Sequence, residues 1–369
     1  MFWCFFWVFI VAFIISTVFC GFIRRFGPQW GLIDNPGHRK IHQNPMPTDG
    51  GLGIWLGVVL PLAVGQLFLW FLLWDRSDGQ SLFPLPEFLE IHLPGLVQQS
   101  KKLWQLLGLG TILVLMGLYD DLRGLGWKIR LTVQLLVAMA VVSLGWRASL
   151  FVDAPLLTYW LSVFWIVGLI NSFNMLDNMD ALSSGVATIC AGFLALIMLT
   201  NPSPETNQPQ LFIGAFLLLL VGALLGFLRH NRPPARLFMG DSGAYFIGYL
   251  IATATLSATF AGYDVPRQTI FVPFVILAVP IYDTVSVVAI RLKEKRSPFV
   301  GDKSHFSHRL VELGFTKSQA VGVVYLVTTI CCLGAVLLYH VPFVGAAMIF
   351  LQVILVLVLI AIFETKRKR

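Results

Sequence analysis

The chain has 369 residues, of which 57% are hydrophobic and only 12% charged, and its mean hydropathy is +0.79. Soluble globular proteins carry about 25% charged residues, so this composition excludes a disordered chain, a secreted disulfide scaffold and an ordinary soluble enzyme. Apolar runs of roughly 20 residues, long enough to cross a bilayer, recur along the chain. We therefore predict an all-α integral membrane protein, in which the net charge of +7 reflects loops beside membrane spans and not a nucleic-acid partner.

Apolar runs bounded by charge, proline or polar clusters predict about eleven transmembrane helices, with ten as the alternative because two runs are short or interrupted by glycine. The spans are expected at residues 2–23, 50–74, 103–119, 130–146, 156–173, 181–200, 210–228, 242–261, 269–290, 319–340 and 342–363. The first run lacks a basic start and a small-residue cleavage site, so we expect a retained span. Residues 1–369 are predicted to form one membrane domain, with an outer loop at 75–102.

Basic residues set the predicted orientation, because lysine and arginine are enriched in cytoplasmic loops. With the N-terminus outside, 21 of the 26 basic residues fall on the cytoplasmic side. The predicted topology is therefore N-out and C-in, and the basic tail at 364–369 is expected to contact lipid headgroups. The cytoplasmic loops are expected at about 24–49, 120–129, 174–180, 229–241 and 291–318.

Two adjacent carboxylates, Asp120 and Asp121, end the third predicted span. Such a pair is unfavourable at a membrane interface unless positive charge lies beside it, and each carboxylate raises the pKa of the other. A divalent cation or a proton is the natural partner. The alternative is a solvated helix end with Arg123 as the counter-charge.

A second polar segment runs from Asn171 to Asp180 and contains no lysine or arginine. Asn171, Asn174 and Asp177 are three residues apart, so a helix would place them on one face. Carboxylate and amide oxygens suit Mg²⁺, which leaves room for substrate phosphates. The alternative is a polar loop in which Asp180 caps the next helix.

Three further segments carry groups that can bind phosphate. Asp241 lies between two glycines at the start of a span, where a helix N-terminus favours anions, and Phe238 just before it could face a base. Lys40 lies in a loop rich in proline and glycine. The last cytoplasmic loop supplies donors to a diphosphate or a sugar, or less simply ligands to zinc. These donors are Arg291, His305, His308 and Arg309.

Five such segments on one membrane face predict a site for a diphosphate and Mg²⁺, with Mn²⁺ as a substitute, and phosphoryl transfer as its reaction. A transporter or flippase is the alternative from a different class. Its coupling residue would be Asp283, deep in the ninth predicted span, although we expect Asp283 to give polar support near the cytoplasmic end. A transporter would place its acids near the bilayer midplane, whereas these lie at span ends.

The same residues resemble the polyprenyl-phosphate N-acetylhexosamine-1-phosphate transferases. The resemblance runs in order from Asp34 to Arg309 and covers most of the chain. Its motifs are Asp34-x-Pro36-x-x-Arg39-Lys40-x-His42, Asp120-Asp121, Asn171-x-x-Asn174-x-x-Asp177-x-x-Asp180, Gly240-Asp241-x-Gly243 and Asp302-Lys303-x-His305-x-x-His308-Arg309. It implies ten or eleven spans and an active site on the cytoplasmic face of a bacterial inner membrane.

The resemblance also implies a reaction in which a UDP-N-acetylhexosamine gives its sugar-1-phosphate to undecaprenyl phosphate and UMP is released. By resemblance, Asn174 and Asp241 hold Mg²⁺, and Asp120, Asp121 and Asp177 are catalytic. Lys40, Asp180, Phe238, Arg291, His305, His308 and Arg309 then contact substrate. Membrane lipids are the other expected partners, and a homodimer is left open.

This sequence departs from the family pattern in the histidine segment and after the aspartates. Ser307 stands where the family often has histidine, and Asn178 and Ala181 stand where glycine is usual. Three consecutive histidines of the peptidoglycan-precursor branch are absent, and Arg309 resembles the branch that uses GlcNAc. We therefore expect UDP-GlcNAc as the donor, with UDP-MurNAc-pentapeptide as the alternative.

Overall fold

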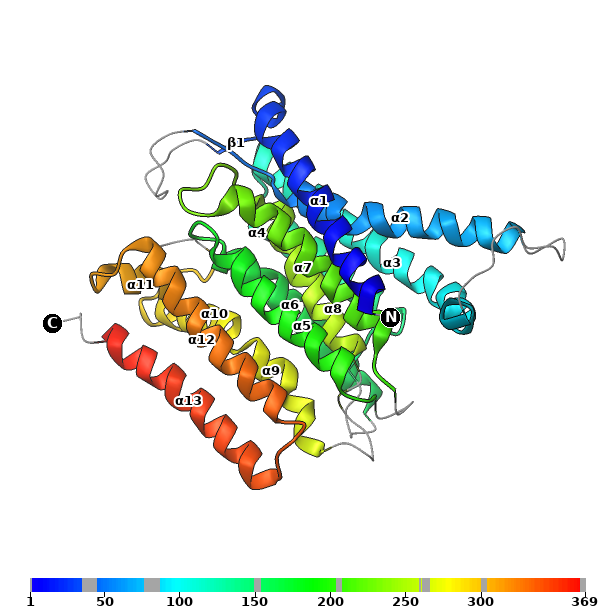
Figure 1. The fold of residues 1–369 in the computed structure, drawn as a ribbon. Helices are drawn as coiled ribbons and strands as arrows, with labels where there is room; N and C mark the ends of the chain where they lie inside the picture. Colours follow the sequence, from blue (N-terminus) through cyan, green and yellow to red (C-terminus); the bar gives the residue numbers. More distant parts are fainter. Residues whose placement is uncertain are drawn as a thin grey trace.

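The computed structural model describes residues 2–34, 45–75, 87–148, 154–203, 208–258, 260, 266–299 and 304–365. In these ranges the chain is almost entirely helical, apart from one short antiparallel pair of strands (Figure 1). The elements are α1 (Phe2–Phe26), η1 (Gly27–Trp30), β1 (Ile33–Asp34), β2 (Met46–Pro47), α2 (Gly51–Asp75), α3 (Glu87–Arg123), α4 (Trp127–Ser143), α5 (Pro155–Leu176), α6 (Leu182–Thr200), α7 (Leu211–Asn231), α8 (Gly240–Ser257), η2 (Arg267–Phe271), α9 (Val272–Ile276), α10 (Ala278–Lys293), α11 (Phe306–Glu312), α12 (Lys317–Leu337) and α13 (Phe343–Thr365).

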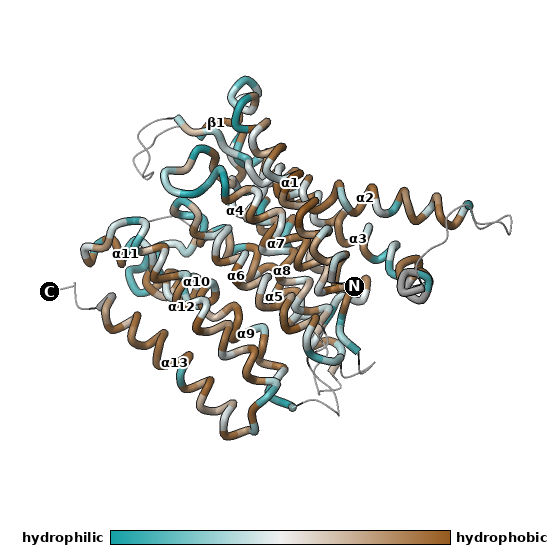
Figure 2. Tube along the Cα trace, viewed as in Figure 1, coloured by the Kyte–Doolittle hydropathy of each residue, from teal (hydrophilic) through white to brown (hydrophobic). Residues whose placement is uncertain are grey.

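Each of the eleven predicted spans contains a helix or a pair of helices. Eight of the described helices are long and apolar enough to cross a membrane, or nine if the bent α9–α10 pair counts as one. α4 and α8 are not among them: α4 has 17 residues, and α8 carries several polar side chains. The chain is thus an all-α, multi-pass membrane protein with hydrophobic helices (Figure 2).

The expected outer loop at 75–102 is partly wrong, because α3 already begins at Glu87. Glutamate, glutamine, leucine and lysine in this stretch are good helix formers, so the helix continues beyond the apolar run. The charged residues and Pro94 in this stretch lower its hydropathy and its expected helix content, so the sequence did not predict this part of α3. Asp120 and Asp121 likewise lie in the last turns of α3 and not in a loop.

The ninth predicted span is broken, since η2 and α9 meet α10 at an angle of 63°. Pro280 explains the break, because it has no N–H to donate to the carbonyl of Ile276, four residues earlier. That carbonyl instead accepts the thiols of Cys190 at 3.3 Å and Cys332 at 3.8 Å. The break is thereby joined to α6 and α12.

α8 lies at the centre of the bundle, where it packs against α3, α5 and α2, and most of its residues are buried. Two glycines allow this packing near the N-terminus of α8. A Cβ atom on Gly51 would lie 2.1 Å from the nitrogen of Gly243, and one on Gly117 would lie 2.3 Å from the nitrogen of Ser242. α2 and α3 therefore cross the start of α8 in backbone contact.

This contact predicts a large effect of Gly117→Ala. The added methyl group must displace the first turn of α8, and overpacking of this kind costs about 1–3 kcal/mol. We expect a lower melting temperature in a thermal-shift assay, together with loss of whatever activity Asp241 supports. Gly108→Ala is the matched control, because a Cβ atom there meets nothing within 4 Å in the same helix. Equal melting temperatures for the two variants would contradict the close approach.

Candidate active site

The polar segments predicted to share one face do meet at one end of the bundle, near β1 and α11 (Figure 1). The amide of Gly50 donates to the carbonyl of Phe238 at 2.9 Å, and the amide of Phe238 donates to the carbonyl of Pro47 at 2.9 Å. Ala181 donates its amide to Asn231 at 2.8 Å. These bonds join the segments before α2, after α5 and before α8, although they are far apart in the sequence.

Asp241 is the centre of the site. Its Oδ1 accepts a hydrogen bond from Nδ2 of Asn174 at 2.6 Å, and its own amide donates to Oδ2 of Asp121 at 2.8 Å. Gly240, with φ of 74°, makes the turn that presents this amide. The two predicted metal ligands, Asn174 and Asp241, are therefore in contact, and a catalytic candidate lies beside them.

Asp120 has a cationic partner that the sequence analysis missed. Nη1 of Arg130 lies 3.1 Å from Oδ2 of Asp120 and 3.5 Å from Oδ2 of Asp241. Oδ1 of Asp120 accepts the amide of Leu125 at 2.6 Å. The counter-charge thus comes from the first turn of α4 and not from Arg123. In the sequence, Arg130 was counted only as a topology signal.

Tyr245 is a second residue that the sequence analysis missed. Its hydroxyl donates toward Oδ2 of Asp241 at 3.0 Å and Oδ2 of Asp120 at 3.3 Å. Its spacing of four residues from Asp241 places both side chains on one face of α8. That spacing was the available signal.

Asp49 is a third missed residue, and it adds another acid to the site. It is fully buried with φ of 66°, and its Oδ1 accepts the hydroxyl of Ser242 at 2.9 Å. Its carboxyl group also lies within hydrogen-bonding reach of Asp121. Burial raises the pKa of Asp49 to about 6. Its position directly before Gly50-Gly51 marked a turn but did not indicate an acid facing the site.

Asp177 and Asp180 lie in the loop between α5 and α6. Burial, and then the negative charges of Asp241 and Asp180, raise the pKa of Asp177 to about 8. Oδ2 of Asp180 accepts the amide of Ala235 at 2.9 Å. Asp180 therefore holds the loop before α8, and its alternative role as a helix cap is wrong, because Ala181 precedes α6 without a side-chain cap.

Asp283 positions the histidine segment. Nδ1 of His305 lies 2.9 Å from Oδ2 of Asp283, whose Oδ1 accepts the amide of Phe306 at 2.7 Å. Nη2 of Arg309 donates to the hydroxyl of Ser286 at 2.9 Å, so α11 is attached to α10 at two points. The rings of His305 and His308 are 6.2 Å apart. The polar support expected of Asp283 is what the structure shows.

Other predicted residues face different surroundings. Asn171 donates to Oε1 of Gln134 in α4 at 2.7 Å, so it does not continue the stripe of Asn174 and Asp177. The guanidinium of buried Arg291 donates to the carbonyl of Pro298 at 2.6 Å, which closes the loop after α10. Phe238 is half-buried, and its backbone bonds to Pro47 in β2 and to Gly50 just before α2. Lys40 lies outside the described residues.

The side chains present fit Mg²⁺ better than zinc. Among the described residues, no three His, Cys, Asp or Glu side chains converge to hold a metal unaided. Mg²⁺ needs fewer protein ligands, because it is bound by one or two carboxylates together with substrate phosphates. If the amide of Asn174 turns over, its oxygen joins Oδ1 of Asp241 as a donor. The site holds more carboxylates than the single charge of Arg130 can neutralise, so binding of a divalent cation next to Asp241 is favoured.

The family model described as Glycosyl transferase family 4 matches residues 103–259, which include Asp120, Asp121, Asn174 and Asp241. Over this range, which is less than half of the chain, the sequence is similar to this family. The recognised range covers α3 to α8, the helices that carry the acidic centre, whereas Asp49 and the histidine segment lie outside it.

Three related bacterial proteins match the chain over most of its length. A protein of Bacillus subtilis, named probable undecaprenyl-phosphate N-acetylglucosaminyl 1-phosphate transferase, is 29% identical over 364 residues, or 95% of this chain and 89% of the relative. Undecaprenyl-phosphate alpha-N-acetylglucosaminyl 1-phosphate transferase of Escherichia coli K12 is 27% identical over 96% of this chain and 88% of its own. Decaprenyl-phosphate N-acetylglucosaminephosphotransferase of Mycolicibacterium smegmatis is 26% identical over 88% of this chain and 80% of its own.

Two of the three departures from the family pattern, Ser307 and Asn178, contact each other. The hydroxyl of Ser307, which is 2% exposed, donates to Oδ1 of Asn178 at 2.6 Å, and Nδ2 of Asn178 donates to the carbonyl of Met175 at 2.9 Å. This bond joins α11 directly to the loop of Asp177, whereas the bonds of His305 and Arg309 attach α11 to α10. Ser307 and Asn178 are thus a matched pair in this chain.

The pair predicts a selective effect of Ser307→Ala. α11 keeps its contacts with α10 but loses its bond to the acidic loop, and a neutral hydrogen bond is worth about 1 kcal/mol. We expect roughly a fivefold rise in KM for the sugar nucleotide and an unchanged KM for the lipid. Adding Ser307→Ala to Asn178→Ala should cause little further loss, because both remove one bond. Additive effects in steady-state kinetics would argue against the pair.

Proposed function

We propose that this chain transfers GlcNAc-1-phosphate from UDP-GlcNAc to undecaprenyl phosphate, giving undecaprenyl-diphospho-GlcNAc and UMP. The observation that carries the proposal is the contact between Asn174, Asp241 and Asp121 at the ends of three hydrophobic helices, with Arg130 as counter-charge. It supports binding of a charged diphosphate at the membrane surface. The names of the relatives supply the sugar and the lipid, and they agree on N-acetylglucosamine.

The reaction proceeds by attack of an oxygen of the lipid phosphate on the β-phosphorus of the nucleotide sugar. A new phosphorus–oxygen bond forms, the bond from the β-phosphorus to the bridging oxygen breaks, and UMP leaves with that oxygen. Because the second pKa of a phosphate monoester is near 6, the attacking group is mostly a dianion at neutral pH. Positioning and charge neutralisation then supply most of the rate enhancement.

The polar residues of the site have two roles, binding of the metal ion and orientation of the neighbouring side chains. Asn174 and Asp241 would hold Mg²⁺, or Mn²⁺ in its place, which when bound neutralises charge on the diphosphate oxygens. Asp120 is already bonded to Arg130, Tyr245 and the amide of Leu125, so it keeps this cation and hydroxyl directed at Asp241. Asp121 faces Asp241 and Asp49 and is the acid beside the incoming phosphate. A covalent enzyme–phosphosugar intermediate trapped by rapid quench would overturn the one-step reaction.

The proposed setting is a bacterial cytoplasmic membrane, with the N-terminus outside and the acidic end facing the cytoplasm. The support is the charge asymmetry of the sequence, since 21 of the 26 basic residues fall in the segments predicted to be cytoplasmic. Cysteine labelling from outside intact cells tests this orientation. A cysteine placed at Arg267, at the end opposite the acids, should react with a membrane-impermeant maleimide, whereas one at Arg236 should not.

The decisive assay is UMP release by the purified protein in detergent with undecaprenyl phosphate and Mg²⁺. UDP-GlcNAc, UDP-GalNAc and UDP-MurNAc-pentapeptide are compared side by side. Release that needs lipid and metal and is fastest with UDP-GlcNAc is the expected result. Preference for UDP-MurNAc-pentapeptide would move the chain to peptidoglycan synthesis, and release from no donor would overturn the proposal.

The pKa of Asp177 predicts how stability depends on pH and metal. A folded-state pKa of about 8, against about 3.9 when unfolded, means that the folded protein binds more protons between these values. The free energy of unfolding therefore falls as pH rises through this window, and it is unaffected by this group below about pH 4. In EDTA, the melting temperature of the parent should fall as the pH rises from about 5 to about 8, and that of Asp177→Asn should fall less steeply. Mg²⁺ should also reduce the slope, and parallel profiles would contradict the assignment.

A further inference from the structure

A second polar cavity lies at the end of the helices opposite the acids. Its volume is about 690 Å³, within the range of about 300–1,000 Å³ typical of small-molecule sites. Residues inside α3 and residues at or just beyond the ends of α4, α6, α7 and α8 surround it, with Lys102 and Arg147 among the lining residues. Neither the family motifs nor the proposed reaction uses this cavity.

The cavity lies at the depth of a membrane surface. Lys102 directly precedes the third predicted span, Arg147 follows the C-terminus of α4, and Ala258 is the C-terminal cap of α8. About 20 residues of α3 separate Lys102 from Asp121, or roughly 30 Å at 1.5 Å per residue, which is the thickness of a hydrocarbon core. The cavity and the acidic site therefore open on opposite membrane surfaces.

Two positive charges at this cavity have no explanation in the topology. Basic residues are depleted on the outer side, where this chain has only five, and two of the five line one cavity. Both side chains are exposed, and within the described part of the chain neither has an ion-pair partner. Their charge is available to an anion.

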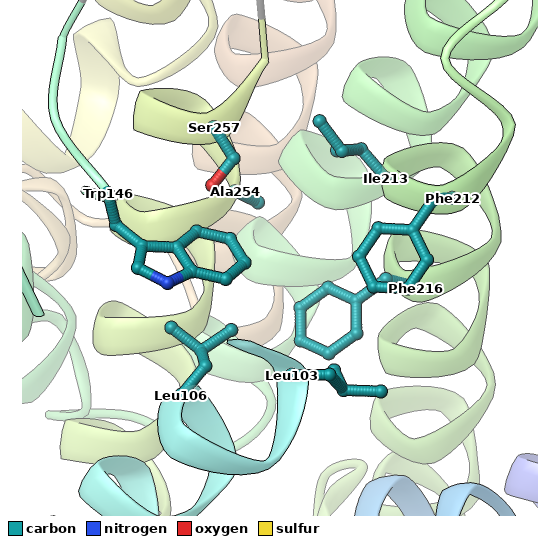
Figure 3. A pocket seen from close by; sticks show the side chains of 8 residues that line it. All are labelled: Leu103, Leu106, Trp146, Phe212, Ile213, Phe216, Ala254 and Ser257. Carbon is teal, nitrogen blue, oxygen red and sulfur yellow. The ribbon is translucent and has the colours of Figure 1, made fainter. Parts of the chain in front are cut away.

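The inner wall of the cavity is apolar. It continues into a small pocket of about 10 Å³, in which Trp146 lies opposite Phe212 and Phe216, with Leu103 and Leu106 below (Figure 3). This pocket holds at most one water molecule, so it closes the cavity on the inside and does not extend it into a channel. The indole Nε1 of Trp146 is buried and has no hydrogen-bond acceptor within the described residues. Cations at the rim and aromatic groups below suit an amphiphile better than a free ion.

We propose that this cavity binds the headgroup of an anionic phospholipid from the leaflet opposite the active site. Lys102 and Arg147 contact the phosphate, and Trp146, Phe212 and Ile213 contact the glycerol backbone and the first carbons of the acyl chains. The inference rests on the predicted spans and does not depend on the proposed reaction. With the proposed orientation, the lipid belongs to the outer leaflet.

The test measures lipid retention by the full-length protein. The protein is reconstituted in nanodiscs of phosphatidylcholine and phosphatidylglycerol, and phosphatidylglycerol that stays bound after transfer to detergent is counted by native mass spectrometry. Each basic residue near an anionic surface contributes about one kilocalorie, so the double variant Lys102→Gln/Arg147→Gln should bind roughly thirtyfold more weakly. Lys101→Gln/Arg267→Gln is the matched control, because it removes two basic residues from the same face outside the cavity lining.

Three outcomes decide the proposal. Loss of phosphatidylglycerol in the double variant, with retention in the control, supports it, as does competition for the site by added phosphatidylglycerol but not by phosphatidylcholine. Equal retention in both variants overturns it. Displacement of the lipid by inorganic phosphate alone also overturns it, since the apolar inner wall would then contribute nothing. A thermal-shift measurement confirms that both variants are folded.

Discussion

Asp241→Asn should reduce lipid-dependent UMP release by about a thousandfold, the upper range for loss of one charge-stabilising group at a reacting centre. The asparagine can accept the bond from Asn174 and leave the backbone bond to Asp121 in place, because that bond uses the amide of residue 241. The change therefore removes the negative charge and retains the local fold. Both the rate and the affinity for Mg²⁺, followed by Mn²⁺ electron paramagnetic resonance, should fall together.

Tyr245→Phe provides the comparison for Asp241→Asn. It deletes the hydroxyl that bonds to Asp241 and Asp120 but keeps every charge, so its effect should be about tenfold or less. Similar losses in the two variants would mean that geometry, and not the charge of Asp241, limits the reaction. Full Mn²⁺ affinity in Asp241→Asn would exclude this residue as a metal ligand.

The sequence was sufficient to predict most of the helices and the convergence of the acids. Hydropathy predicted a helix or helix pair in each of the eleven ranges, because a bilayer requires long apolar helices, and eight or nine of the described helices are long and apolar enough to cross one. The motifs around Asp120, Asn174 and Asp241 predicted an acidic centre, which the structure brings into direct contact. The start of α3 was missed because a helix can continue past its apolar run, where hydropathy no longer reports it.

The missed site residues have a common cause. Arg130, Tyr245 and Asp49 lie in three different segments, and each acts through a contact with an acid that is far away in the sequence or one helical turn away. Hydropathy and spacing assign such residues to topology, packing or a turn. The crossing of α2 and α3 over the start of α8, through Gly51 and Gly117, brings Asp49 and Tyr245 to the acids, and the turn from α3 into α4 adds Arg130.

The same reasoning explains the histidine segment. Ser307 and Asn178 each departed from the family pattern and gave no sign in sequence of being related. The structure shows that the hydroxyl of Ser307 donates to Asn178. Asp283, which could have indicated ion coupling, is occupied by His305 and the amide of Phe306.

Arg130→Gln should be the second most damaging substitution at the site. Arg130 is the cation between Asp120 and Asp241, and its side chain is 30% exposed, so its removal leaves two neighbouring carboxylates without this counter-charge. Because Arg130 and Asp241 are partly exposed, although Asp120 is buried, we expect a loss of stability of about 1–3 kcal/mol, below the range for a fully buried pair. Both substrates are anionic, so their KM values should rise while kcat falls, and kcat/KM should drop roughly a hundredfold.

Arg123→Gln is the control that separates this effect from net charge. Arg123 is exposed in the last turn of α3, only a few residues from Asp120, and its removal changes the charge of the same face by the same amount. Its kcat/KM should stay within about twofold of the parent, as expected for an exposed charge. Arg130→Lys should recover only part of the activity, because the lysine side chain is shorter and its ammonium group cannot reach the position from which Nη1 contacts both carboxylates. If Arg123→Gln were as damaging as Arg130→Gln, the acids would depend on the general positive potential of the loop and not on one arginine placed between them by the turn from α3 into α4.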